Sequence, residues 1–70
     1  MAWSYKKLWI LLIEKGLKKT QLKEMCKMGT TTLAKLGKDE AVSMDVLQRI
    51  CEALDCNIGD IVDYIPDKDN

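Results

Sequence analysis

The sequence contains no histidine, and its three cysteines, Cys26, Cys51 and Cys56, show no regular spacing. Histidine is a common general base and a common zinc ligand, so its absence removes a frequent residue of catalytic sites and of zinc sites. No two cysteines have the two-residue separation of a metal-binding pair, and their odd number argues against a disulfide framework. We therefore expect no metal site and interpret the cysteines as small buried thiols in a reducing cytosol.

Catalytic and phosphate-binding motifs are missing as well. Neither Ser4 nor Ser43 lies in a nucleophile-elbow sequence, and the four glycines form no phosphate-binding loop. These absences predict a protein that is not an enzyme, with no catalytic residue and no cofactor. Seventy residues also leave no room for a separate effector-binding domain, so no small-molecule ligand is expected.

Long apolar runs are also lacking. The run over residues 8–13 is six residues long, whereas a bilayer span needs about 20 and a secretory signal needs a longer apolar core. The residues that follow, Glu14, Lys15 and Gly16, offer no small-residue cleavage site. The sequence therefore predicts no membrane association and a cytoplasmic location.

Charge is balanced in total, with eleven basic and eleven acidic residues, but it is unevenly distributed. Residues 5–38 carry nine lysines against two glutamates, a net charge of +7. Residues 39–70 carry two basic against nine acidic residues, a net charge of −7. The basic half suits a phosphate backbone, although the same lysines would also serve as a solvated surface.

Apolar residues recur at three- and four-residue spacing, which predicts an all-α fold of five helices. Ser4 is suited to cap a first helix that runs to about Lys15, and Gly16 is placed to end it in the left-handed region. The other helices are expected at residues 19–26, at residues 30–36 with threonine caps, after the cap Ser43, and after the cap Asn57 with Asp60 in a capping-box-like position. Strand patterns are absent, although residues 2–5 fit a short extended arm.

The candidate core follows from the same spacing. The residues expected to face inward are Tyr5, Leu8, Trp9, Leu12, Ile13, Leu22, Met25, Cys26, Leu33, Leu36, Leu47, Ile50, Cys51, Leu54, Ile58, Ile61, Val62 and Ile65. Ile10 and Leu11 lie off this stripe, so they either pack under the acidic half or form a self-association surface.

No linker or internal repeat divides the chain, so we expect a single domain over residues 1–70. Its helical core is expected at about residues 5–65, with a flexible tail at 66–70. Domains this small lie near the lower limit of stability, which makes self-association plausible.

Two short helices joined by a three- to four-residue turn form a motif that lays one helix into the major groove of DNA. Residues 16–22, 28–36 and 42–61 resemble the Cro/C1-type (XRE) helix-turn-helix family, and the likeness covers about residues 5–65. The most diagnostic part is the closing segment, with Ala-Leu-Asp-Cys at 53–56 and Ile-Gly-Asp-Ile at 58–61. The resemblance implies a compact five-helix, λ-repressor-like bundle in a small bacterial or phage regulator.

Two positions depart from the family pattern. Lys23 stands where the family commonly has alanine, and Lys27 stands where it commonly has glycine in the turn. Lysine in a left-handed turn costs on the order of 1 kcal/mol, unless Gly29 takes over the strained position.

The resemblance also assigns candidate DNA-binding residues. Thr30, Thr31 and Lys35 match the family's base-reading and phosphate-reading positions, and Lys19 matches its phosphate clamp. Lys18 and Lys38, together with Lys23 and Lys27, are candidate backbone contacts. A purely structural role is the alternative for each: the threonines would only cap the helix, and the lysines would only be solvated.

The resemblance therefore predicts a transcriptional regulator, a repressor that reads duplex DNA as a homodimer at the bacterial nucleoid. A protein-interaction or antitoxin-like module is the alternative. In that case Trp3, Tyr5, Trp9, Ile10 and Leu11 would dock a protein partner, although aromatic residues at helical spacing are more often core.

Overall fold

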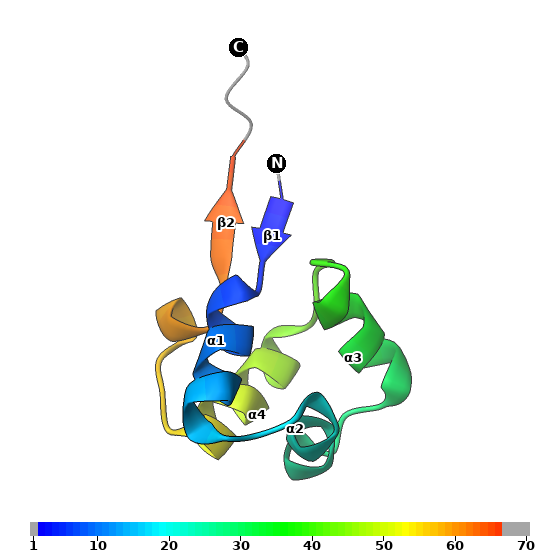
Figure 1. Cartoon of the computed structure of the whole chain (residues 1–70). Coiled ribbons are helices and arrows are strands. Elements are labelled where there is room, and N and C mark those ends of the chain that lie inside the picture. The colour runs from blue at the N-terminus through cyan, green and yellow to red at the C-terminus, as the bar shows by residue number, and fades with distance from the viewer. Residues whose placement is uncertain (1, 67–70) are drawn as a thin grey trace.

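The computed structural model of the chain describes residues 2–66, which form four α-helices, one 3₁₀ turn and a two-stranded antiparallel sheet. In chain order the elements are β1 (Ala2–Ser4), α1 (Lys6–Lys15), α2 (Lys19–Cys26), α3 (Thr30–Gly37), α4 (Met44–Leu54), the 3₁₀ turn η1 (Ile58–Asp60) and β2 (Asp63–Ile65). The short ribbon of β1 and β2 projects from the helical body on the side away from α2 (Figure 1).

The predicted fifth helix is wrong. Its capping interaction is present, because the Asn57 backbone N–H donates to Asp60 Oδ2 at 3.0 Å, but only one 3₁₀ turn follows. The chain then becomes extended and pairs with β1 in the register Ala2↔Ile65, Trp3↔Tyr64 and Ser4↔Asp63. This pairing joins segments about 60 positions apart. The apolar spacing within residues 58–65 therefore could not indicate that a strand forms there. The extended arm expected at the N-terminus is confirmed as β1.

Local signals placed most of the other helix ends correctly. α2 has the predicted bounds, Gly16 ends α1 with φ of 71°, and Ser43 Oγ accepts a bond from Val46 N–H at 3.3 Å to cap α4. Two predicted caps are wrong, since the N-cap residues are Tyr5 for α1 and Gly29 for α3 rather than Ser4 and a threonine.

All four α-helices end in a similar way. A residue with positive φ follows the helix, and a backbone N–H beyond it bonds back to the carbonyl five positions earlier. The left-handed residues are Gly16, Lys27, Asp39 and Asp55. The bonds run from Leu17 to Leu12, Met28 to Lys23, Glu40 to Lys35 and Cys56 to Cys51, at 2.9–3.1 Å. Three of the four left-handed positions thus carry a side chain, at a cost in backbone strain.

One hydrophobic core joins the elements. It consists of Tyr5, Leu8, Leu12, Leu22, Cys26, Met28, Leu36, Leu47, Ile50, Leu54 and Ile61. Four residues expected to face inward are instead exposed, namely Ile13, Met25, Ile58 and Ile65. Leu11 packs against the core, whereas Ile10 is 46% exposed. Within residues 2–66, no helix has the length and apolar character needed to cross a membrane.

The flexible tail that the sequence predicts lies, apart from Pro66, outside the described residues.

Candidate nucleic-acid interface

The helix-turn-helix is built from α2, a three-residue turn at residues 27–29, and α3. Leu22 on α2 and Leu36 on α3 have no solvent-exposed surface, and Met28 in the turn is also buried. These three side chains anchor the motif to the core from both helices and from the turn between them. The outer face of α3 is therefore held outward by the burial of its inner face.

The strained backbone position of the turn is Lys27. Lys27 has φ of 53° and ψ of 40°, in the left-handed region, while Gly29 is extended with φ of −78°. Gly29 therefore does not relieve the strained position. The Lys27 side chain remains exposed next to the start of α3.

The first turn of α3 presents hydroxyl groups to solvent. Thr30 and Thr31 are both exposed, and Lys35 is exposed one turn further along the helix. The N-cap is Gly29, which has no side chain that would bond the first-turn amides. The outer face of α3 thus carries two hydroxyls at the N-terminal end of the helix dipole and one ammonium group, that of Lys35, in the last turn.

Lys18 and Lys19 stand at the start of α2. The Lys18 backbone N–H donates to Gln21 Oε1 at 2.8 Å, which fixes the helix start and leaves the Lys18 side chain exposed. The ammonium of Lys19 lies 4.4 Å from the ring centroid of Trp9 on α1. Trp9 itself is half-buried and packs against the core. Trp9 therefore holds Lys19 through a cation–π contact, which no motif in the sequence indicates.

Lys38 lies at the C-terminal end of α3 and is exposed. The ion pairs between described residues are Lys7–Asp63 at 3.2 Å and Arg49–Asp45 at 2.7 Å. Within residues 2–66, then, none of the six candidate DNA-binding residues forms an ion pair. The four lysines among them are therefore not paired with a carboxylate of the described residues.

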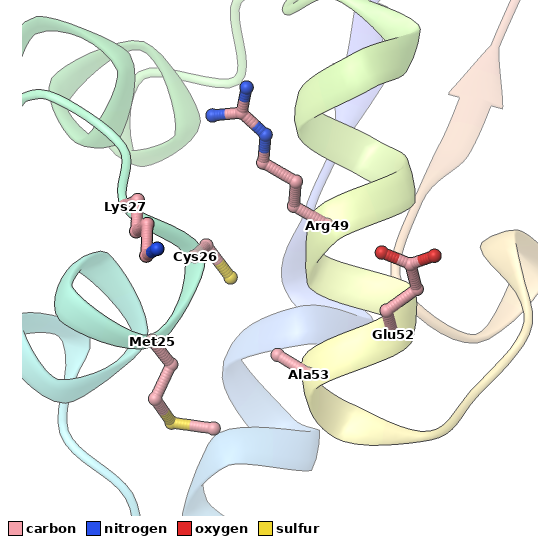
Figure 2. Close-up of a pocket in the computed structure, with 6 residues that line it drawn as sticks. All are labelled: Met25, Cys26, Lys27, Arg49, Glu52 and Ala53. Atoms are coloured by element: carbon pink, nitrogen blue, oxygen red, sulfur yellow. The ribbon is translucent and has the colours of Figure 1, made fainter.

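A depression of about 660 Å³ lies between α2 and α4, beside the helix-turn-helix turn (Figure 2). Its lining includes Lys27 and Cys26 on one side and Arg49 on the other, and the Arg49 side chain extends from α4 toward α2 and α3 (Figure 2). Burial raises the pKa of the Cys26 thiol, and the positive charge of Arg49 acts in the opposite direction. Arg49 thus lies beside the turn, where its charge is paired with the Asp45 carboxylate at 2.7 Å.

Two hydrogen bonds tie the segment after α3 to the start of α1. The Tyr5 hydroxyl donates to the Glu40 carbonyl oxygen at 2.7 Å, and the Tyr5 backbone N–H donates to Asp39 Oδ1 at 3.2 Å. Burial and the Asp39 carboxylate raise the pKa of Tyr5. No spacing in the sequence pointed to this contact, because the partners are 34 and 35 positions apart.

This arrangement is that of a helix-turn-helix DNA-binding domain, and comparison with known families agrees. Residues 7–67 match the family described as the Cro/C1-type HTH DNA-binding domain, and the chain belongs to that family. Its members are non-enzymatic DNA-binding regulators, which confirms the predicted class.

Two particular proteins are similar to this chain. The uncharacterised HTH-type transcriptional regulator YozG of Bacillus subtilis (strain 168) is 34% identical over 62 residues, which cover 86% of this chain and 74% of YozG. The crystal structure of the transcriptional regulator VanUg is similar with a TM-score of 0.91 and 48% sequence identity. That match covers 94% of this chain and 88% of the VanUg chain.

Proposed function

We propose that this protein is a sequence-specific repressor that inserts α3 into the major groove of duplex DNA. The observation that carries the proposal is the exposure of Thr30, Thr31 and Lys35 on α3 while Leu36 of the same helix is fully buried. A helix held in this way offers its polar face to a groove. Threonine hydroxyls bond base edges or phosphates, their methyl groups contact thymine methyls, and lysine reaches guanine acceptors or phosphate.

The remaining candidate residues serve the phosphate backbone in this proposal. Lys18 and Lys19 lie at the start of α2, and Lys38 lies just after α3, so they stand at the two ends of the helix-turn-helix. Each lysine that contacts a phosphate releases condensed counterions, which gives affinity without sequence preference. Thr30, Thr31 and Lys35 would then supply the discrimination between sequences.

We further propose that the protein acts as a homodimer on two half-sites at the nucleoid. One recognition helix of eight residues contacts few base pairs, and pairing two copies extends the site. Repression follows from occupation of a promoter by such a dimer. Sedimentation of the protein with and without its site would measure the stoichiometry, and a single copy on the bound site would contradict the dimer.

Selection of bound fragments from a genomic pool, followed by fluorescence anisotropy at several salt concentrations, tests the main proposal. We expect Thr31→Ala and Lys35→Ala to lower the affinity for the selected site, Thr31→Ala with relaxed sequence preference. Lys15→Ala is the matched control, because Lys15 is an exposed lysine on α1, outside the helix-turn-helix. Absence of binding even at low salt would overturn the proposal.

A further inference from the structure

The C-terminal end of α4 carries two cysteines, Cys51 in its last turn and Cys56 just beyond it. Both are half-buried, unlike the third cysteine, Cys26, which is 3% exposed. The expectation that all three are buried thiols is therefore wrong for this pair. Asp55 between them is left-handed, and the Cys56 N–H donates to the Cys51 carbonyl oxygen at 3.0 Å.

This backbone pattern brings the two side chains together. In a helix end of this kind, the first and last residues of the bonded loop commonly make a side-chain contact across the cap. The same two positions at the end of α1 hold Leu12 and Leu17, and both pack in or against the core. At the end of α4 the two equivalent positions hold thiols, Cys51 and Cys56.

The separation between the Cα atoms of Cys51 and Cys56 also permits a disulfide bond. A 3.0 Å hydrogen bond from the Cys56 N–H to the Cys51 carbonyl, with standard bond lengths, keeps the two Cα atoms within about 7 Å. That is the distance beyond which a disulfide needs backbone movement. The pKa of the Cys56 thiol is raised, chiefly by burial and then by the neighbouring Cys51 thiol and Asp60, while Lys15 lowers it.

Cys56, the residue that would react first, is accessible to a small reagent. Cys56 lines a depression of about 280 Å³ between α1 and the turn η1, together with Ile10 and Glu14. In Figure 1 the end of α4 and the following turn lie beside α1, on the opposite side of the molecule from α3. The pair therefore lies apart from the proposed DNA-reading face.

We propose that Cys51 and Cys56 form a dithiol modification site that closes to an intramolecular disulfide with small-molecule disulfides such as glutathione disulfide. In the first step the thiolate of Cys56 attacks one sulfur of the reagent, forming a mixed disulfide and releasing one glutathione thiolate. The Cys51 thiolate then attacks the Cys56 sulfur and releases the second glutathione. The two thiol protons pass through solvent to the two glutathione products, so one reagent disulfide is reduced and one protein disulfide is formed.

The full chain, incubated with glutathione disulfide and then alkylated, tests this site. A protease that cuts after Glu52 or Asp55 separates the two cysteines, so a disulfide keeps the resulting peptides together in mass spectrometry. We expect the Cys51–Cys56 crosslink with Cys26 alkylated as a free thiol. The rate should increase as the pH rises above neutrality, because the raised pKa of Cys56 limits the thiolate fraction.

Variants identify the pair. Cys51→Ser should stop at a mixed disulfide on Cys56, and Cys26→Ala should still form the crosslink. If Cys26→Ala fails to fold, alkylation of Cys26 in the oxidised unmodified chain shows equally that Cys26 takes no part in the crosslink. Glutathione adducts without a crosslink, or oxidation of Cys26 as fast as of the pair, would overturn the proposal. DNA affinity is measured separately, so its loss or absence does not bear on this result.

Discussion

The carboxylate of Asp39, just beyond the end of α3, binds the backbone at the start of α1. Asp39 Oδ1 accepts a hydrogen bond from the Tyr5 backbone N–H at 3.2 Å, and Tyr5 is the N-cap residue of α1. The Tyr5 hydroxyl completes the link by donating to the Glu40 carbonyl at 2.7 Å. Asp39 is itself left-handed, with φ of 58°, a conformation that aspartate tolerates better than most residues. The end of α3 is thereby fixed to the start of α1.

Tyr5→Phe removes the bond to Glu40 and leaves a carbonyl without its partner. We expect the free energy of unfolding to fall by about 1 kcal/mol, the usual net value of such a hydrogen bond. Urea denaturation measures the change. Tyr64→Phe is the matched control, because Tyr64 is 46% exposed and should alter stability little. Equal effects of the two substitutions would show that the hydrogen bond from the Tyr5 hydroxyl to Glu40 does not stabilise the fold.

Stability should also decline in alkaline solution. The pKa of Tyr5 is raised in the folded protein from its ordinary value of 10.0, so the unfolded chain loses this proton first as the pH rises. The contribution of Tyr5 is therefore complete below pH 10 and is lost as the pH rises through the folded-state pKa. Denaturation between neutral and strongly alkaline pH should show a steeper decline for the unmodified chain than for Tyr5→Phe. Parallel curves would rule out this source of pH dependence.

Lys27→Gly should separate stability from DNA binding. Glycine adopts the left-handed conformation of Lys27 without strain, so we expect the free energy of unfolding to rise by about 1 kcal/mol. The lost charge should weaken DNA binding and reduce its salt dependence by about one counterion.

Asp55→Gly is the control for the effects of Lys27→Gly on stability and on DNA binding. Asp55 is also left-handed, but it follows α4 on the acidic half of the chain. It should stabilise the protein without lowering DNA affinity. Thermal or urea unfolding, with anisotropy on the same samples, measures both quantities. If Lys27→Gly lowers stability, the account of strain in the turn is wrong.

Trp9 should affect DNA binding only through Lys19. Trp9→Leu keeps an apolar side chain against the core but removes the ring that lies 4.4 Å from the Lys19 ammonium. We expect a loss of affinity equivalent to about 0.5–1 kcal/mol, the size of an exposed cation–π contact.

A double-mutant cycle checks this dependence. Trp9→Leu should lower affinity in the unmodified chain but have little further effect once Lys19→Ala is present. Additive losses would mean that Trp9 acts through folding or through its own DNA contact, not by positioning Lys19.

The parts of the fold set by neighbouring residues were predictable. Gly16 ends α1, Ser43 caps α4, and the apolar spacing of Leu47, Ile50 and Leu54 gave the buried face of α4. Each of these depends on interactions within about one helical turn, which the linear sequence contains. The family pattern likewise placed the helix-turn-helix and the exposed candidate residues on α3, whose contacts with DNA stay a prediction.

Features made by distant segments were not predictable in this way. The spacing of Ile58, Ile61 and Ile65 fits a helix, but the strand at 63–65 is chosen because residues 2–4 lie alongside it. Exposed Ile13 and Met25 also satisfied the helical stripe, and only the placement of the neighbouring helices decided which side chains of that stripe are covered. Local periodicity indicates which face of a helix is the most apolar. It does not indicate how much of that face the neighbouring helices bury.

The sequence by itself determined the family, the four main helices and the separation of basic from acidic residues, because short-range spacing and capping chemistry encode them. Tertiary structure alone decided the β ribbon, the Tyr5–Asp39 link, the support of Lys19 by Trp9 and the position of Arg49 beside the turn. Those contacts join residues ten or more positions apart, and their formation depends on how the helices pack together rather than on any local preference of the chain.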